Sequence, residues 1–194
     1  MDDYEKICAT RAYFIRICLL GDGAVGKTAL RERYLGKGFS SNYIMTIGAD
    51  FAVKQVNIAS RPAKFQIWDL AGQPRFSSVR ALYYRGSMGA LLIFDVTRPD
   101  SFANAQSWVN ELWKSNGKGP VPIVLLGNKA DLRGQGADEI SNEQAIAYAA
   151  KVSEETQATG FEISYMETSA KSGKNVYQAF ELLGKNILDY VQNA

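Results

Sequence analysis

Glycines, a lysine and a hydroxyl residue follow one another at fixed spacing near the start of the chain. Residues 21–28 read GDGAVGKT, in which Gly21, Gly26, Lys27 and Thr28 match G-x-x-x-x-G-K-[ST]. The glycines let backbone N–H groups turn inward, Lys27 supplies positive charge, and the Thr28 hydroxyl can bind Mg²⁺. An apolar run precedes the motif and a helical pattern follows it, which argues against an ordinary glycine-rich turn. The motif predicts a phosphate-binding loop made by Gly23, Ala24, Val25, Gly26, Lys27, Thr28 and Ala29.

A carboxylate and an amide follow a later apolar run. Asp69 ends the run, and Gly72 and Gln73 come next, within the sequence FQIWDLAGQ at residues 65–73. A carboxylate beside a phosphate loop can hold the Mg²⁺ shell through water. Gly72 can offer its N–H to a terminal phosphate, and Gln73 can orient an attacking water molecule. D-x-x-G-Q alone is a common turn sequence, so this prediction depends on its place after the phosphate loop.

Two further elements indicate which base the nucleotide carries. Asn128, Lys129 and Asp131 follow the apolar run at residues 121–126. Asp131 can accept hydrogen bonds from N1–H and the 2-amino group of guanine, a donor pattern that adenine lacks. Asn128 can brace the loop, and Lys129 can lay its stem along the ring. The last element, made by Ser169, Ala170 and Lys171, can bring the Ala170 N–H to guanine O6.

Thr46 lies in a polar loop, residues 38–48, which also contains Phe39 and Tyr43. Such a loop can close when Thr46 meets Mg²⁺ and the terminal phosphate, and it can open once that phosphate leaves. Without the other motifs, Thr46 would be read as a surface threonine on an ordinary connection. We therefore expect a switch loop here.

Apolar runs bounded by turn residues predict strands at residues 13–20, 65–70, 89–96 and 121–126, with a weaker one at 161–166. Continuous runs of this kind suit strands that are buried on both faces of a largely parallel sheet. Residues 50–58 instead alternate, through Phe51 and Val53, which is typical of an exposed edge strand.

Helical patterns lie between these runs. Ser141 and Gln144 have the spacing of a capping box that opens a helix running to about Lys151. Ser101 is a plausible N-cap for another helix. Residues 175–191 carry one apolar stripe, made by Val176, Phe180, Leu183, Ile187 and Val191. Strands that alternate with helices bind ligands beyond their carboxyl ends, so the chemistry is expected in the loops there.

Composition narrows the class of protein. The chain has 194 residues, 46% of them hydrophobic and 22% charged, with a formal net charge of +2. These values predict one folded domain and give no sign of a nucleic-acid partner. Residues 1–12 lack the apolar core of a signal peptide, and no apolar stretch is long enough to span a membrane. We expect an intracellular, cytoplasmic protein with two reduced thiols, Cys8 and a buried Cys18.

Over about residues 13–191 the chain resembles the Ras-superfamily small GTPases, most closely their Rab branch. The stretches that carry the resemblance are IGADF at 47–51, KFQIW at 64–68, RFSS at 75–78, YYRG at 83–86 and LIFDVT at 92–97. The resemblance implies a P-loop NTPase small G domain of the α/β class. Its expected sheet has six strands, mostly parallel with one antiparallel edge strand, and helices on both faces. Residues 1–12 would then be an N-terminal extension and 192–194 a short C-terminal end.

The resemblance also implies roles for single residues. Its cofactors would be GTP or GDP and Mg²⁺, with Thr28, Thr46 and Asp69 at the metal and Phe39 packed against guanine. Lys27, Thr46 and Gln73 would take part in hydrolysis, and Tyr43 would lie beside the nucleotide. Effector, exchange-factor and GTPase-activating proteins would be bound by a monomer through Thr46, Phe51, Trp68 and Tyr83. The alternative for the three aromatic residues is an ordinary cluster at the sheet edge.

Four features depart from the Rab pattern. Gly23 stands where Rabs usually carry Ser, so the phosphate loop is Rho-like and leaves room for a partner's arginine finger. Pro74 replaces the usual acidic residue, and it restricts Gln73 toward an extended conformation. Residues 151–160 form a longer segment than in most relatives. The chain as written has no C-terminal Cys, no polybasic tail and no myristoylation signal, so no lipid anchor is expected unless a tail is missing or a partner recruits the chain to a membrane.

These observations predict a molecular switch that binds GTP with Mg²⁺ and hydrolyses it slowly alone and faster with an activating partner. It would signal through residues 38–51 and 71–86. One alternative is a nucleotide-locked scaffold in which Pro74 disables Gln73. Another is a P-loop kinase or ATPase of a different family, which Asp131 argues against.

Overall fold

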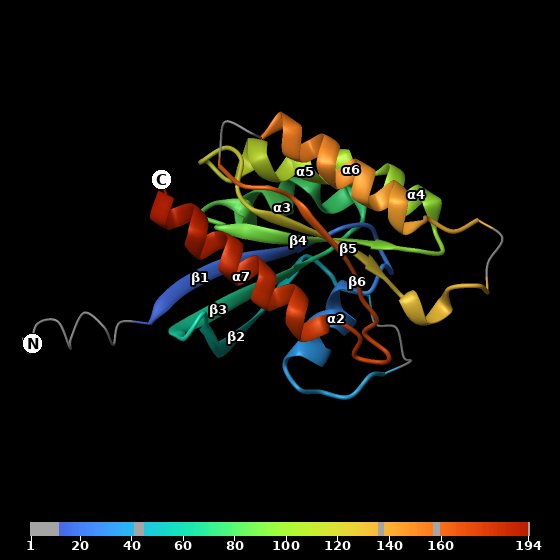
Figure 1. Cartoon of the computed structure of the whole chain (residues 1–194), viewed down its shortest axis with the longest axis horizontal. Helices are drawn as coiled ribbons and strands as arrows, with labels where there is room; N and C mark the ends of the chain where they lie inside the picture. The colour runs from blue at the N-terminus through green and yellow to red at the C-terminus, as the bar shows by residue number, and fades with distance from the viewer. Residues whose placement is uncertain (1–11, 41–44, 136–137, 157–159, 194) are drawn as a thin grey trace, which may run out of the picture.

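The computed structural model describes residues 12–40, 45–135, 138–156 and 160–193. One six-stranded sheet crosses the molecule, and helices cover both of its faces (Figure 1). The predicted α/β class, with a mostly parallel sheet and one antiparallel edge strand, is confirmed.

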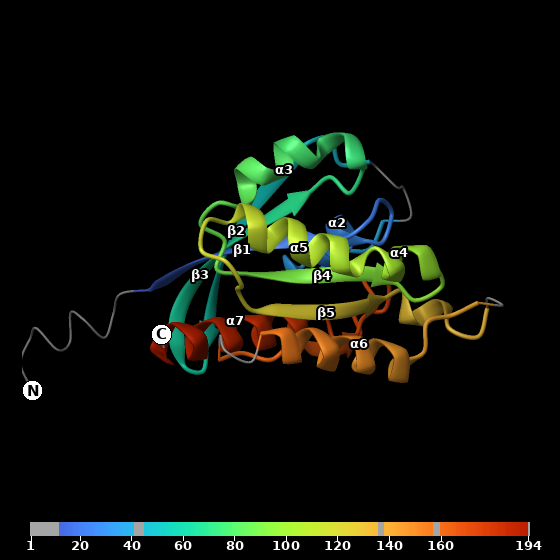
Figure 2. The ribbon, with the colours of Figure 1, turned by 90° about the horizontal axis from the view of Figure 1, so that it is seen from above.

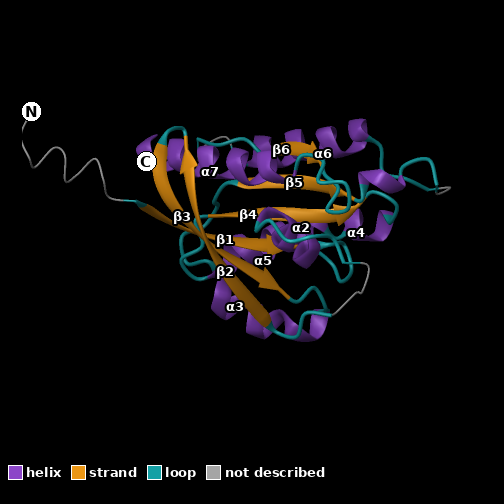
Figure 3. Cartoon of the chain, turned by 90° about the horizontal axis from the view of Figure 1, so that it is seen from below, coloured by secondary structure: helices purple, strands orange, loops and turns teal. Residues whose placement is uncertain are grey.

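The strands are β1 (Tyr13–Leu20), β2 (Ala49–Ile58), β3 (Arg61–Leu70), β4 (Gly89–Asp95), β5 (Ile123–Asn128) and β6 (Ser164–Glu167). Their order across the sheet is β2-β3-β1-β4-β5-β6, so β2 and β6 are its edges (Figure 3). β2 pairs antiparallel with β3, and the remaining neighbours are parallel. Every residue of β4 and β5 is buried, as continuous apolar runs in the centre of a parallel sheet require.

The α-helices are α2 (Lys27–Tyr34), α3 (Ser77–Tyr84), α4 (Pro99–Ala103), α5 (Ala105–Ser115), α6 (Asn142–Glu155) and α7 (Val176–Asn193). Two short 3₁₀ turns, η1 (Pro74–Phe76) and η2 (Ala130–Leu132), follow β3 and β5. α2 and α7 pack on one face of the sheet, and α3, α4, α5 and α6 pack on the other (Figure 1). Figure 2, seen from the side of the second group, shows α3, α5 and α6 side by side over the sheet. The sheet therefore has a separate apolar core on each side.

Side-chain direction along the strands explains the two cores. Ile15, Ile17 and Leu19 of β1 face α2 and α7, whereas Cys18 and Leu20 face the other core. Cys18 is a buried free thiol, as predicted, and burial raises its pKa to about 11. Cys8 lies outside the described residues.

Most predicted element boundaries agree with the structure to within a few residues. β3 begins at Arg61, earlier than the apolar run suggested, because its first residues, Arg61 and Pro62, are exposed and pair with β2, which an apolar run does not signal. α6 continues to Glu155, beyond the expected Lys151. The capping box is confirmed: Ser141 accepts from the Gln144 N–H, and the Gln144 side chain accepts from the Ser141 N–H.

The prediction that Ser101 is a helix N-cap is wrong. α4 begins at Pro99 with Arg98 as its N-cap residue, so Ser101 lies inside the helix. Its hydroxyl accepts a hydrogen bond from the Asp95 N–H at 3.0 Å and donates one to Arg98 O at 2.7 Å. Ser101 therefore ties the end of β4 to α4, which is a tertiary role that the local sequence pattern does not reveal.

Candidate nucleotide-binding site

A cavity of about 470 Å³ opens beyond the carboxyl ends of the parallel strands. It collects residues from the loop after β1, the start of α2, the connection to β2, the loop after β3 and the loop after β5. The lining residues that the sequence predicted are Gly23, Ala24, Gly26, Lys27, Thr28, Ala29, Phe39, Thr46, Gly72, Gln73 and Lys129. Segments far apart in the chain thus meet where strand topology places a ligand.

The loop between β1 and α2 has a conformation that depends on glycine. Gly21 and Gly26 have φ angles of 129° and 100°, in the region that side chains rarely adopt. A Cβ atom at Gly21 would lie 2.0 Å from the Ile93 carbonyl oxygen, and one at Gly26 would lie 2.3 Å from Asn128 Nδ2. Ala24 also takes a positive φ, 63°. Space and backbone conformation both select the two glycines of the motif.

The Lys27 side chain folds back on this loop and bonds to its backbone. Its Nζ donates to the carbonyl oxygens of Gly21 and Asp22 at 2.7 and 2.8 Å, and the side chain is almost fully buried. Burial lowers the pKa of Lys27 to about 8, although Asp69 and Asp22 oppose the shift. A phosphate beside this ammonium group would gain a charge-assisted hydrogen bond.

Two hydroxyls and one carboxylate meet beside Lys27. Thr28 Oγ1 donates to Asp69 Oδ2 at 2.5 Å and lies 3.0 Å from Thr46 Oγ1. Asp69 is fully buried, and its Oδ1 has no hydrogen-bond partner among the described residues. Burial raises the pKa of Asp69, because its charged form loses water, although Thr28 and Lys27 oppose the rise. Hard oxygen donors around an unpaired buried carboxylate oxygen fit Mg²⁺.

Asn128 joins three loops. Its Nδ2 donates to Val25 O at 2.8 Å, and its Oδ1 accepts from Thr168 Oγ1 at 3.2 Å and from the Ala170 N–H at 3.3 Å. Val25 therefore contributes a carbonyl group to this junction, while its side chain is buried in the core. The predicted bracing role of Asn128 has a physical basis in these contacts. In this structure the Ala170 N–H is directed at Asn128.

Lys129 and Asp131 lie on the predicted base-binding side. Lys129 has a φ of 65°, and its Nζ lies 2.6 Å from Oδ2 of the buried Asp95. This ion pair holds the Lys129 side chain along the cavity, and Lys129 is one of the lining residues. Asp131 Oδ1 accepts from the Ser169 hydroxyl, so the two elements that were predicted to contact the base contact each other.

Gln73 lines the cavity beside the phosphate loop. Its backbone is extended, with φ −80° and ψ 142°, and Pro74 then opens η1. A Cβ atom on Gly23 would lie 3.7 Å from Gln73 Nε2, so the amide is directed at the loop. Gln73 Oε1 is buried without a hydrogen-bond partner in the part of the chain that the structure describes.

Several predicted residues lie outside the cavity lining: Val25, Asp69, Asn128, Asp131, Ser169, Ala170 and Lys171. Tyr43 lies outside the described residues. Sequence reasoning missed Glu32, Lys37, Gly38 and Ser40, which also line the cavity. It also missed Asp95, which follows the central apolar run as Asp69 does, a signal that could have been used.

Three aromatic side chains, which come from β2, β3 and α3, form a continuous row. Phe51 and Trp68 have ring centroids 5.0 Å apart, and Trp68 and Tyr83 have centroids 4.8 Å apart. Phe51 remains 52% exposed at the edge strand β2. The row therefore presents apolar surface next to the loops that carry Thr46 and Gln73.

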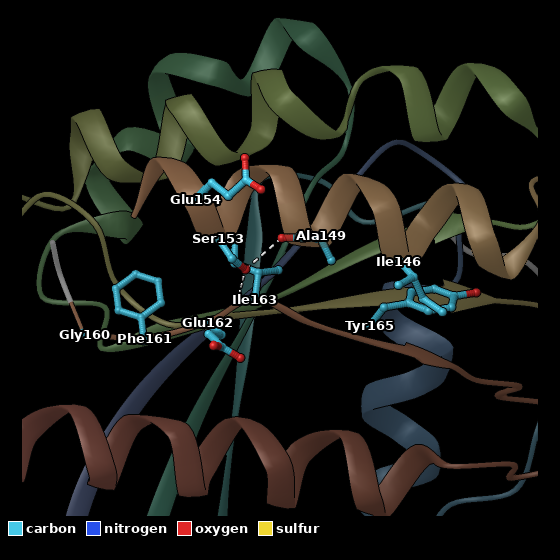
Figure 4. A pocket seen from close by; sticks show the side chains of 10 residues that line it. Ile146, Ala149, Ser153, Glu154, Gly160, Phe161, Glu162, Ile163 and Tyr165 are labelled. Atoms are coloured by element: carbon cyan, nitrogen blue, oxygen red, sulfur yellow. Dashed lines mark hydrogen bonds between the residues drawn. The ribbon is translucent and has the colours of Figure 1, made fainter. Parts of the chain in front are cut away.

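A second hollow, of about 730 Å³, lies between α6 and β6. Figure 4 shows Ile163 and Phe161 below α6, with Ser153 between the helix and the strand. The Ser153 hydroxyl donates to Ala149 O and accepts from the Ile163 N–H, both at 2.8 Å. Within the longer segment noted at residues 151–160, the first five residues continue α6 to Glu155, and Ser153, Glu154 and Gly160 line this hollow. Residues 157–159 lie outside the described residues.

Comparison with known proteins decides the family. A sequence model of the Ras family matches residues 16–189 of the chain. The chain belongs to the Ras family of small GTPases.

Its relatives lie near the Rab branch. This small GTPase is 39% identical over 176 residues to Ras-related protein Rab-13 of Canis lupus familiaris, covering 91% of the chain and 81% of the relative. It is 41% identical over 178 residues to Ras-related protein Rab7 of Drosophila melanogaster, covering 90% and 81%. Rab7 of Pisum sativum is 41% identical over 181 residues, covering 92% and 84%. The resemblance read from the sequence is confirmed.

No helix in the described ranges is both long enough and apolar enough to cross a membrane.

Proposed function

We propose that this small GTPase is a molecular switch that binds GTP and GDP with Mg²⁺ and signals through residues 38–51 and 71–86. The observation that carries the proposal is that Thr28 bonds to Thr46 and to the buried Asp69 next to Lys27, at a cavity that Lys27, Thr28 and Thr46 line. Within the described residues no group of three or more His, Cys, Asp or Glu side chains could hold a metal. A set of two hydroxyls and one carboxylate instead suits a magnesium–phosphate complex.

In this proposal different side chains bind the phosphates, the metal ion and the base. Lys27 and the N-terminus of α2 attract the phosphates, and Thr28 and Thr46 would hold Mg²⁺ directly, with Asp69 behind them. Bound Mg²⁺ would neutralise charge that develops on the phosphate oxygens. In this proposal Asp131 accepts from guanine, the stem of Lys129 covers one ring face, and Phe39 lies at the nucleotide.

Hydrolysis in this proposal depends on positioning. Gln73 holds the attacking water, and Gly72 offers its N–H to the terminal phosphate. The missing side chain at Gly23 leaves space beside Gln73 for a partner's arginine. When the terminal phosphate leaves, Thr46 and Gly72 lose a ligand, and the two switch loops are released.

The row of Phe51, Trp68 and Tyr83 is the proposed effector surface, together with Thr46. Phe51 belongs to the segment 38–51 and Tyr83 to the segment 71–86, and Trp68 joins them, so the shape of the row depends on the state of both segments. Effector, exchange-factor and activating proteins would share this region.

We assign residues 13–191 to the G domain, 1–12 to an extension and 192–194 to the end of the chain.

Single-turnover hydrolysis tests the proposal. Gln73→Leu is expected to keep GTP affinity and to lower the hydrolysis rate by about tenfold or more, because general positioning of water typically contributes factors of this size. Gln55→Leu, the same change on the exposed strand β2, should leave the rate unaltered. An unchanged rate for Gln73→Leu would remove Gln73 from the mechanism.

The extended backbone of Gln73 before Pro74 favours a second candidate, a nucleotide-locked scaffold. In that case the wild-type protein would bind GTP tightly and release no phosphate, with or without cell extract that contains activating proteins. Phosphate release by the wild-type protein excludes it.

A further inference from the structure

A network of polar contacts links the phosphate loop to the loop of Gln73 through α5. It is made by Arg80 on α3, by Asn104 at the N-cap of α5, and by Trp108 and Glu111 within α5. Residues 104, 108 and 111 are four and three residues apart and so share one helical face. We call these four residues the brace. None of them belongs to the nucleotide motifs.

One side of the brace holds the phosphate loop. Trp108 Nε1 donates to Asp22 Oδ1 and Asn104 Nδ2 donates to Asp22 Oδ2, both at 2.8 Å. The Asp22 carbonyl in turn accepts from Lys27. Next to it, Arg98 Nη1 donates to Gly23 O at 3.0 Å. The outer side of the loop is therefore fixed by α5 and by the residue that precedes α4.

The other side of the brace holds the Gln73 loop. Arg80 is almost fully buried, and its Nη1 donates to Ala71 O at 3.0 Å and to Gln73 O at 2.9 Å. Its Nε and Nη2 bind the two carboxylate oxygens of Glu111 at 2.7 and 2.8 Å. This bidentate pair fixes the orientation of the guanidinium group.

Trp108 joins the two sides. Its indole N–H holds Asp22, and the Arg80 guanidinium lies 4.4 Å from the centre of its ring. The two loops also touch directly, because a Cβ atom on Gly72 would lie 2.4 Å from the Asp22 carbonyl carbon and 2.5 Å from Gly23 N. A shift of Asp22 or Arg80 would therefore change the spacing between Gly23 and Gln73.

We propose that Trp108, with Arg80, is a positioning residue for GTP hydrolysis, which sets the distance between the phosphate loop and Gln73. The inference rests on the proposed function, since it concerns the geometry of that reaction. Trp108 is not among the residues that line the cavity, and it acts through Asp22 of the phosphate loop and through Arg80.

The test compares one substitution at two places on α5. Trp108→Phe keeps a ring beneath Arg80 but removes the N–H that holds Asp22. Trp113→Phe is the matched control, because Trp113 Nε1 donates to Val121 O at 3.3 Å, apart from both loops. Both variants lose one indole hydrogen bond from the same helix, so a purely structural effect would lower their unfolding midpoints to a similar extent.

At saturating GTP, the single-turnover rate of Trp108→Phe is expected to fall about tenfold to a hundredfold, because small misplacements at a reacting centre have effects of this order. Its GTP affinity should change by less than about threefold, and Trp113→Phe should keep the wild-type rate. Should Trp108→Phe fail to fold, Asn104→Ala, at an exposed position, is expected to lower the rate about two- to threefold.

The outcomes separate the two proposals. A wild-type protein that releases no phosphate contradicts the proposed function. A wild-type protein that hydrolyses GTP while Trp108→Phe and Asn104→Ala do so equally fast overturns the brace alone. Equal rate losses in Trp108→Phe and Trp113→Phe would also overturn it, because the effect would then be general to α5.

Discussion

At the scale of single residues, base recognition depends on the pattern of donors and acceptors. In the proposed function the Asp131 carboxylate accepts from both N1–H and the 2-amino group of guanine, and in the structure the Ser169 hydroxyl donates to its Oδ1. A buried acceptor left without a donor destabilises the wrong complex more than an extra contact stabilises the right one. Guanine specificity should therefore reside in this carboxylate.

Asp131→Asn is expected to lower GTP affinity by about a hundredfold, since hydrogen bonds to charged groups contribute roughly 1.5–3 kcal/mol each. The asparagine amide offers one acceptor and one donor, which matches the N1–H and 2-carbonyl of xanthine, so XTP should bind better than GTP. Competition against labelled nucleotide measures the affinity for GTP and the affinity for XTP. Asp138→Asn, an exposed acidic residue nearby, should change neither affinity. A variant that still prefers GTP to XTP would contradict this account.

Gly26 combines a special backbone conformation with a close neighbour. Gly26→Ala would place a methyl group 2.3 Å from Asn128 Nδ2, and we expect GTP affinity to fall by at least about tenfold because the Asn128 junction must move. Gly36→Ala is a matched control, since Gly36 has a similar φ of 88° but no atom within 4 Å of the added Cβ. Both variants share the backbone strain. Equal GTP affinities in the two variants would show that the Asn128 junction is unimportant.

At the scale of elements, sequence patterns that reflect a local hydrogen bond predicted the structure well. The Ser141 capping box is present as the spacing predicted, because both partners lie within one helical turn. Ser101 shows the limit: the same residue type bonds to β4 rather than capping a helix, and only the tertiary structure shows this.

Some features of the candidate site could be predicted from the sequence, and others could not. Motif residues such as Lys27 and Thr28 were predictable, because phosphate chemistry dictates their types and spacing. The Asp22–Trp108 contact joins residues 86 positions apart, and no local pattern signals it.

Ser141→Ala should destabilise the protein by about 1 kcal/mol, because the Gln144 N–H loses its partner at the exposed start of α6. The unfolding midpoint is then expected to fall by roughly 2–4 °C for a chain of this size. Ser107→Ala, on the exposed face of α5, should leave the midpoint within about 1 °C, as surface substitutions usually do. Equal thermal scans of the two variants would argue that the capping box contributes nothing.

At the scale of the whole molecule, one cavity is lined by loops that come from distant parts of the chain. The lining comes from the loops after β1, β3 and β5 and from the connection between α2 and β2. A ligand that binds only the folded state stabilises the whole chain in proportion to the logarithm of its concentration over Kd. Removing Mg²⁺ should therefore act on global stability as well as on exchange.

Chelation of Mg²⁺ from the purified protein is expected to speed nucleotide release and to lower the unfolding midpoint. A ligand present at 1,000 times its Kd contributes about 4 kcal/mol, and roughly 2–4 °C of midpoint corresponds to each kcal/mol. Refilling with GDP and Mg²⁺ should restore the midpoint, and ADP with Mg²⁺ should not. A midpoint that is indifferent to chelation would oppose a role for Mg²⁺ in holding the nucleotide.

The central claim, a guanine-nucleotide switch with hydrolysis, is tested most directly by mass spectrometry of the nucleotide released from freshly purified protein and from the same protein loaded with GTP and then incubated. The account predicts GDP or GTP at about one molecule per chain, and a shift from GTP to GDP during incubation. Adenine nucleotides in their place, or loaded GTP that stays unchanged even with activating extract, would contradict it.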